Sequence, residues 1–196
     1  MGIGNSRLSP REVAKIVGYM PQEHSIVFPY RVIDYVLMGR APHYSLFSMP
    51  SRKDYGKVMQ VLRELGLETL ASKTVAEISG GQLQLVLIAR ALAQEAKILV
   101  LDEPISHLDV RNAMKVLRVI RKLVQSGTAL GVILSLHDPF LASMFCDKVI
   151  ILDQGRVVAH GKPEESLSPD ILESVYGVKF DVITHNGRKL VIPIIT

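Results

Sequence analysis

The sequence predicts an α/β fold built on a parallel sheet. One observation is a pair of short apolar runs, Ile98–Leu101 and Leu130–Leu136, which are typical of buried parallel strands. The other is the segment Val110–Gln125 between them, where apolar residues recur at helical spacing. A strand, a helix and a strand within about 40 residues form a βαβ unit. We therefore expect the two strands to be parallel and both faces of the sheet to be covered.

The N-terminal third is predicted to be helical. Ser51-Arg52-Lys53-Asp54 has the spacing of a capping box, and apolar residues follow it at helical spacing as far as Gly66, where a C-terminal cap is expected. Further along, Ser79 is expected to cap a helix that runs through Leu92.

The C-terminal third changes pattern and predicts small hairpins. Ser168-Pro169-Asp170 is expected to begin a short helix between the hairpins, closed by Gly177. The two hairpins join pairs of apolar runs through turn sequences. These are Val149–Leu152 with Arg156–Ala159 around Asp153-Gln154-Gly155, and Asp181–Thr184 with Lys189–Ile195 around Asn186-Gly187.

Length and composition favour a single domain over residues 1–196, because 48% hydrophobic residues allow a sizeable core. Within it we expect a helical subdomain at roughly 22–75, a core at 76–145, and hairpins with a helix at 146–196. The net charge of +4 is mild and does not imply a nucleic acid partner. Apolar runs are too short and polar to insert into a bilayer. The single cysteine, Cys146, excludes an internal disulfide, and a cytoplasmic location is expected.

Two adjacent carboxylates, Asp102 and Glu103, stand at the carboxyl end of the first strand. Ligand sites of open α/β sheets lie at such ends. One carboxylate can serve Mg²⁺ while the other orients an attacking water, because successive strand residues point in opposite directions. Asp-Glu-Pro also suits an ordinary turn at a strand end, and that alternative remains open.

Ser79-Gly80-Gly81-Gln82 begins the next predicted helix. Two glycines let an anion approach the backbone N–H groups at the helix N-terminus, where the dipole favours negative charge. The alternative is an ordinary helix start.

His137 follows the second strand, with Asp138 as a possible N-cap and Pro139 at the first helical position. Its strand and that of Asp102 are expected to end on the same side, so His137 could reach a phosphate near Glu103. The alternative is a structural, hydrogen-bonded histidine.

The order and spacing of these segments resemble the nucleotide-binding subunit of ABC transporters over nearly the whole chain. Five motifs carry the resemblance. They are the Q-loop glutamine Gln22, the signature Ile78–Gln82, the Walker B strand Ile98–Asp102 with Glu103 as catalytic glutamate, the D-loop Ser106–Asp109, and the switch histidine His137.

The resemblance implies an ABC ATPase core related to P-loop NTPases, with ATP and Mg²⁺ as cofactors. Glu103 and His137 would be catalytic, and Asp102 and Gln22 would serve Mg²⁺ held with the nucleotide. Nucleotide binding would fall to Ser79, Gly80, Gly81, Gln82 and Asp109, and of these Ser79, Gly81 and Gln82 would face the partner's ATP. Implied partners are a second ABC ATPase subunit and a membrane permease, which the helical insert would dock at the inner face of the plasma membrane.

Further residues are similar to importers of iron-siderophores, haem, cobalamin and related metal chelates. Gly39-Arg40-Ala41-Pro42-His43 fits that subgroup, as do Leu92-Ala93-Gln94, His160-Gly161-Lys162-Pro163 and Val175-Tyr176-Gly177. For Arg40 and His43 we expect a surface loop rather than a chemical role.

The phosphate-binding pattern G-x-x-x-x-G-K-[S/T] does not occur in the sequence. We therefore expect a truncated cassette that lacks the N-terminal strands and the Walker A portion, with an open, apolar edge beside the strand of His137. An alternative to the active importer subunit is a non-catalytic subunit or pseudogene product that supplies its signature to an intact partner. An ABC ATPase acting on DNA or ribosomes is disfavoured, because no sustained heptads lie between Gln22 and Ser79.

Overall fold

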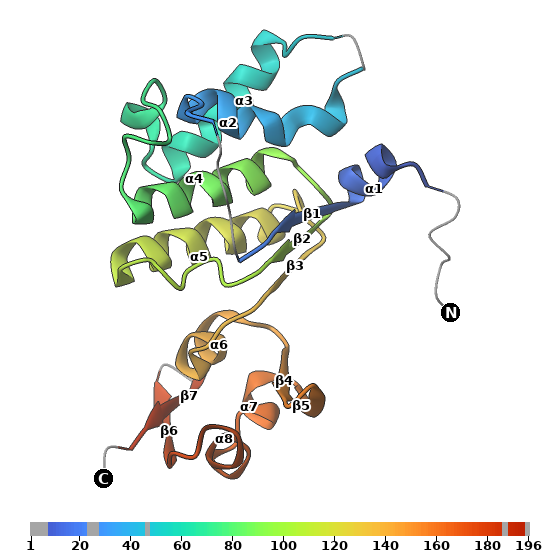
Figure 1. Cartoon of the computed structure of the whole chain (residues 1–196). Coiled ribbons are helices and arrows are strands. Elements are labelled where there is room, and N and C mark those ends of the chain that lie inside the picture. Colours follow the sequence, from blue (N-terminus) through green and yellow to red (C-terminus); the bar gives the residue numbers. More distant parts are fainter. Residues whose placement is uncertain (1–7, 23–27, 46–47, 186–187, 195–196) are drawn as a thin grey trace. The chain divides into compact units, whose positions relative to one another are not determined.

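A computed structural model describes residues 8–22, 28–45, 48–185 and 188–194 of the chain (Figure 1). The chain divides into two compact units, residues 1–135 and residues 136–196. Each unit has a hydrophobic cluster of its own.

The first unit contains a three-stranded parallel sheet in the order β1-β2-β3. Its strands are β1 (Val17–Met20), β2 (Ile98–Leu101) and β3 (Gly131–Leu134). The predicted parallel pairing of β2 with β3 is confirmed. The prediction of an entirely helical N-terminal third is wrong at Val17–Met20, which pairs with β2 along its whole length. The backbone N–H of Asp102 extends that pairing by donating to Met20 O at 2.9 Å.

Helices account for most of the remainder of the first unit. The capping box at Ser51 is confirmed, because Ser51 Oγ accepts from the Asp54 N–H while Asp54 accepts from the Ser51 N–H. Gly66 follows α3 with φ 69°, a conformation that glycine adopts readily. The elements are α1 (Pro10–Ile16), α2 (Val32–Leu37), η2 (Met38–His43), α3 (Arg52–Glu64), η3 (Glu68–Leu70), α4 (Gly80–Ala93) and α5 (Val110–Gln125).

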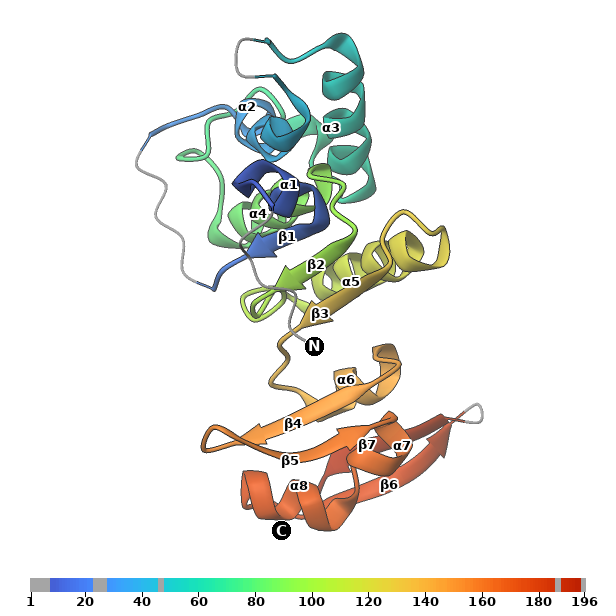
Figure 2. The ribbon, with the colours of Figure 1, turned by 90° about the vertical axis from the view of Figure 1, so that its right-hand side faces the viewer.

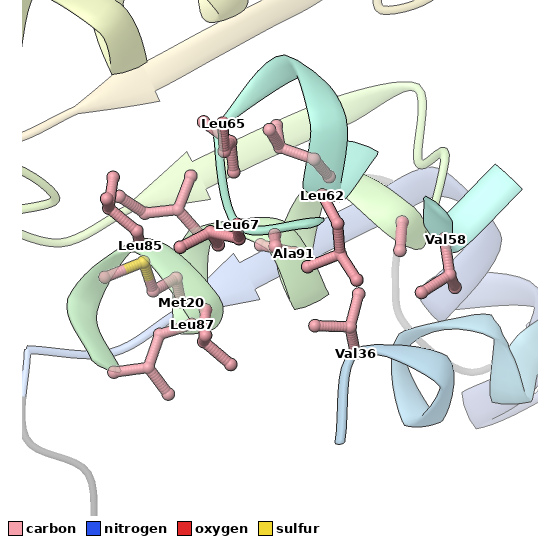
Figure 3. Packing of buried hydrophobic residues seen from close by; sticks show 14 of the residues in the cluster. Met20, Val36, Val58, Leu62, Leu65, Leu67, Leu85, Leu87 and Ala91 are labelled. Carbon is pink, nitrogen blue, oxygen red and sulfur yellow. The ribbon is translucent and has the colours of Figure 1, made fainter. Parts of the chain in front are cut away.

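The core of this unit lies between one face of the sheet and its helices (Figure 3). Met20, Leu99 and Leu101 point into it from the strands, because alternate strand residues share a face. Val58 and Leu62 of α3 join them, and α4 contributes Leu85, Leu87 and Ala91. Each fully buried large side chain stabilises the fold by about 1.5–3 kcal/mol.

The opposite face of the sheet is less well covered than expected. Tyr19, Val100 and Ile133 are partners in the strand register and lie on this face together. Tyr19 is 59% exposed and Ile133 is 64% exposed. The prediction that both faces are covered is therefore wrong for the described residues, because the helices that bury the sheet pack on the other face. Among the described strands β3 lies at an edge of the sheet, as expected.

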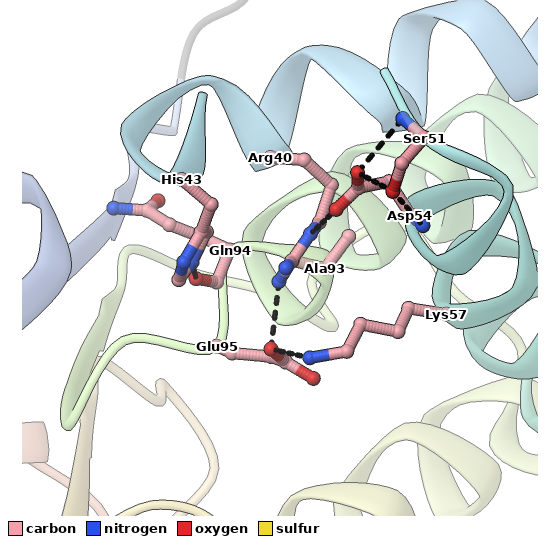
Figure 4. Close-up of polar contacts among 8 residues, drawn as sticks. All are labelled: Arg40, His43, Ser51, Asp54, Lys57, Ala93, Gln94 and Glu95. Atoms are coloured by element: carbon pink, nitrogen blue, oxygen red, sulfur yellow. Dashed lines mark hydrogen bonds and ion pairs between the residues drawn. The ribbon is translucent and has the colours of Figure 1, made fainter. Parts of the chain in front are cut away.

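The Gly39–His43 segment corrects a second expectation (Figure 4). Arg40 is not in an exposed loop, since only 4% of it is accessible. Its guanidinium donates to Ala93 O at 3.0 Å and pairs with Glu95 at 2.7 Å and Asp54 at 3.3 Å. The close approach of this segment to α4 requires the glycine at position 39, because a Cβ there would lie 2.2 Å from Arg90 O. The segment joins the helical insert to the end of α4.

The second unit is built from two hairpins and three short helices (Figure 2). Both predicted hairpins are confirmed, although the turn Asn186-Gly187 lies outside the described residues, as does the end of the second predicted strand at Ile195. The first turn places Gln154 at φ 46° and Gly155 at φ 76°. The elements are α6 (Pro139–Phe145), β4 (Val149–Asp153), β5 (Arg156–Gly161), α7 (Pro163–Ser166), α8 (Pro169–Tyr176), β6 (Phe180–His185) and β7 (Arg188–Pro193).

Candidate functional site

The carboxyl ends of β1, β2 and β3 bring polar residues to one edge of the sheet. Asp102 and Glu103 follow β2, Ser135 follows β3, and Gln22 comes two residues after β1. Such an edge is where open α/β sheets bind ligands. The structure thus places the predicted carboxylate pair at the expected end of a parallel strand.

Ser135 links the two carboxylate residues. Its hydroxyl donates to Asp102 Oδ1 at 2.7 Å and accepts from the backbone N–H of Glu103 at 2.7 Å. These two hydrogen bonds, called the Ser135 relay below, fix the direction of the Asp102 carboxylate and the position of the Glu103 backbone. Sequence reasoning missed Ser135; the available signal was a hydroxyl residue directly after an apolar strand that neighbours β2.

Glu103 adopts an unusual backbone conformation with φ 45°. Residues other than glycine rarely take this left-handed conformation, and such strain gathers at functional sites. Hydrogen bonds to the carbonyl groups of this turn stabilise the conformation. Gln84 Nε2 donates to Glu103 O at 3.4 Å and to Pro104 O at 3.2 Å. Ser106 Oγ donates to Glu103 O at 3.1 Å. Gln84, which is only 7% exposed, is a second residue that sequence reasoning missed.

The signature residues form the first turn of α4. Ser79 is the N-cap: its Oγ accepts from the Gln82 N–H at 3.3 Å, and Gln82 Oε1 accepts from the Ser79 N–H at 3.0 Å. A Cβ at Gly80 would meet nothing within 4 Å, and one at Gly81 would only reach His107 O at 3.8 Å. Packing among the described residues therefore does not require the two glycines, which leave the backbone open to an approaching group.

Asp109 is the N-cap of α5. Its carboxylate accepts from the Asn112 backbone N–H at 2.7 Å and from Asn112 Nδ2 at 3.1 Å. This contact gives the D-loop aspartate a structural role that sequence reasoning did not foresee. The predicted nucleotide-binding role of Asp109 stays a prediction.

His137 lies in the second compact unit, before α6. The predicted local structure is confirmed: Asp138 caps the helix by accepting from the Phe140 N–H at 2.8 Å, and Pro139 stands at its first turn. The main-chain oxygen of His137 accepts a hydrogen bond from Tyr176 Oη at 3.3 Å. The approach of His137 to a phosphate beside Glu103 stays a prediction, because the two residues belong to different units.

The residues present suit a nucleotide with its magnesium ion. Asp102 and Gln22 offer the hard oxygen donors that Mg²⁺ prefers, and the ion commonly takes only one or two protein ligands besides phosphate and water. No group of three or more His, Cys, Asp or Glu side chains in the described ranges is arranged to hold a metal by itself.

Comparison with known proteins decides the family. A family model described as ABC transporter matches residues 4–106. The chain belongs to the ABC transporter ATP-binding family. It is 34% identical to a "Probable iron chelatin transport ATP-binding protein" of Helicobacter pylori over 94% of the chain and 72% of that relative. It is 35% identical to the "Hemin import ATP-binding protein HmuV" of Thermobifida fusca over 95% of the chain and 65% of that relative.

Solved structures support the same ABC cassette fold. A putative metal-chelate type ABC transporter in an inward-facing conformation matches with a TM-score of 0.80 and 33% identity, over 92% of this chain and 73% of that one. The chain spans 64% to 72% of the length of the first curated relatives it matches. In the described part of this ABC protein, none of the helices is both long and apolar enough to cross a membrane.

Proposed function

We propose that the chain is an ATP-binding and ATP-hydrolysing subunit of an ABC importer for a metal chelate. The observation that carries the proposal is the relay from Asp102 through Ser135 to Glu103 at the carboxyl end of the sheet. A structural turn needs neither two carboxylates nor a strained backbone at the second of them.

Each residue of the relay has a distinct task in the proposed reaction. Mg-ATP, when bound, supplies the phosphoryl group and the cation that neutralises its charge. Asp102, oriented by Ser135, serves the magnesium ion, and Gln22 assists from the end of β1. Glu103 orients the attacking water, and the contacts of Gln84 and Ser106 hold its backbone in place. His137 contacts the terminal phosphate.

The first turn of α4 faces a partner's nucleotide in this proposal. Gly80 and Gly81 present backbone N–H groups at a helix N-terminus, which attracts phosphate, between the capping residues Ser79 and Gln82. The open backbone at Gly80 supports this assignment, because no side chain or backbone of the described chain comes close to it. The partner is a second ABC ATPase subunit, so that two subunits share their ATP sites, and Asp109 lies at their contact.

The substrate class rests on the relatives, whose names refer to iron chelatin transport, hemin import and a metal-chelate type transporter. The chelate itself contacts the permease, and the helical insert of this chain docks that permease at the cytoplasmic face of the membrane. Exposed apolar side chains support this role of the insert. They are Phe28, Tyr30, Met38, Met49 and Tyr55.

A second candidate function follows from one sequence observation, the missing G-x-x-x-x-G-K-[S/T] pattern. In that case the chain supplies only its signature to an intact partner, and Glu103 has no nucleotide of its own beside it. The two candidates make different predictions for substitutions at Glu103 and at Ser79.

The test is Mg-ATP hydrolysis by the importer complex purified from the native host, with this chain carrying Glu103→Gln, Ser79→Arg or the exposed control Ser72→Arg. Loss of turnover with Glu103→Gln supports the active subunit, and loss with Ser79→Arg alone supports the signature donor. Turnover that survives both substitutions contradicts the proposal.

A further inference from the structure

We propose that Tyr176 is a positioning residue for His137, resting on the role proposed for His137 above. The relationship joins the end of α8 to the residue before α6, inside the second compact unit. It gives a task to the Val175-Tyr176-Gly177 sequence, which the proposed reaction does not otherwise use.

The geometry consists of one hydrogen bond and one ring contact. Tyr176 Oη donates to the main-chain oxygen of His137 at 3.3 Å. The Tyr176 ring packs edge-on against Phe180, with centroids 5.8 Å apart and planes at 62°. The ring contact holds the phenol in place, and the hydroxyl extends that constraint to the backbone of His137.

Gly177 brings these residues together. It ends α8 with φ 68°, and its N–H donates to Glu173 O, as a left-handed C-cap requires. The chain then turns into β6, whose first residue is Phe180. A residue with a side chain would disfavour this turn, so the glycine after Tyr176 is needed for the ring contact.

Hydrogen bonds constrain the backbone at His137 and at the start of the helix that follows it. Tyr176 binds the His137 carbonyl, and the Asp138 carboxylate accepts from the N–H groups of Phe140 and Leu141. His137 also lines an open pocket of about 640 Å³, together with Phe140, Tyr176 and Pro193. Tyr176 thus acts on the main chain of His137 beside this pocket.

The hydroxyl of Tyr176 remains a donor at physiological pH. Burial, reinforced by the charge of Asp138, raises the pKa of the phenol above its ordinary value near 10. The hydrogen bond to His137 is therefore not switched off by titration of Tyr176 in the neutral range.

The experiment is NMR of the full chain, comparing wild type with Tyr176→Phe. This change removes the hydroxyl and keeps the ring against Phe180. We expect an upfield shift of the His137 carbonyl carbon and greater mobility of its imidazole, while the other histidine rings keep their signals. His137→Gln assigns the ring, and Tyr19→Phe, which removes an exposed tyrosine hydroxyl in the first unit, is the matched control.

A carbonyl shift and a ring mobility for His137 that do not differ between wild type and Tyr176→Phe would overturn the proposal. Tyr176→Leu separates positioning from packing, because it also removes the ring contact and is expected to lower the unfolding midpoint. In the assembled importer, Tyr176→Phe is expected to lower kcat about fivefold with KM for ATP unchanged, the effect of one neutral hydrogen bond. The NMR result does not depend on turnover, so an inactive complex would contradict the proposed function alone.

Discussion

Ser135 Oγ donates to Asp102 Oδ1 at 2.7 Å and accepts from the Glu103 N–H at 2.7 Å, so one hydroxyl at the end of β3 sets two residues at the end of β2. The strand pairing places them, because Leu134 is in register with Leu101. The neighbouring strand therefore orients the Asp102 carboxylate and the Glu103 backbone. Because linked hydrogen bonds strengthen one another, loss of either bond of this hydroxyl is expected to weaken the other.

Ser135→Ala removes both hydrogen bonds while leaving the strand pairing intact. We expect the free energy of unfolding to fall by about 1–2 kcal/mol, because a hydrogen bond to a charged group is lost and the Glu103 N–H loses its acceptor. Urea denaturation measures the change, with exposed Ser72→Ala as the control. In the importer complex, turnover should fall while permease binding is unchanged; equal turnover in mutant and wild type would contradict the role given to the relay.

Gln84→Leu tests the support behind Glu103. The substitution keeps a side chain of similar volume but removes the donor to the Glu103 and Pro104 carbonyls. Leaving the buried Pro104 carbonyl unsatisfied is expected to cost about 1–3 kcal/mol. Hydrogen exchange should rise at Ser106 and Leu108, whose N–H groups bond within this turn, more than in α3. The exposed Gln60→Leu serves as control. Unchanged hydrogen exchange after Gln84→Leu would show that the turn is stable without Gln84 and would contradict this prediction.

The left-handed backbone at Glu103 predicts different stabilities for two variants that both remove the carboxylate. Glu103→Gly removes the carboxylate and relieves the conformational strain, whereas Glu103→Ala removes the carboxylate and keeps the strain. The glycine variant should be more stable than the alanine variant by about 1 kcal/mol. Thermal unfolding of the pair measures the difference. If alanine is the more stable of the two, the residue is not strained.

Arg40→Gln tests the joint between the helical insert and α4. The guanidinium is buried, and removing it takes one partner each from Glu95, Asp54 and the Ala93 carbonyl. Breaking one side of a buried pair is expected to cost about 3 kcal/mol. Arg31→Gln, which disrupts the exposed pair with Asp34, is the control and should change stability little. Equal urea midpoints for the two variants would contradict the structural role of Arg40.

Glu95 makes the same joint sensitive to acid. Burial opposes its ionisation, but hydrogen bonds from Lys57 and Arg40 outweigh that effect and lower the pKa of the carboxyl below 4.5. A lowered folded pKa means that this stabilisation is complete above pH 4.5 and is lost as the pH falls through the folded value. We expect urea midpoints of wild type to fall between pH 5 and pH 3 more steeply than those of Glu95→Gln. Parallel pH curves would contradict the coupling.

Much of the fold could be predicted from the sequence where the signals are local. The caps at Ser51, Ser79 and Asp138, the strand Ile98–Leu101 and the helix Val110–Gln125 depend on residues within a few positions of each other. Val17–Met20 was missed as a strand because its four residues carry no alternation, and only pairing with β2 defines it.

The motifs of the candidate site could be recognised in the sequence, but the residues that hydrogen-bond to them could not. Asp102 and Glu103 are adjacent in sequence, whereas Ser135 and Gln84 reach them only because β3 and α4 lie beside β2. Arg40 was misplaced for a similar reason: its three acceptors come from α3 and from the end of α4. Long-range contacts of this kind leave no periodic signal in the sequence.

The most direct test of the proposed function is uptake of a labelled metal chelate by the native host. Iron-siderophore, haem and cobalamin would each be offered to cells whose chain carries Glu103→Gln, with Glu164→Gln, at an exposed position of α7, as the control. We predict that Glu103→Gln abolishes uptake of one of these chelates while the control and wild type take it up equally. Normal uptake of all three by the Glu103→Gln cells would contradict the account.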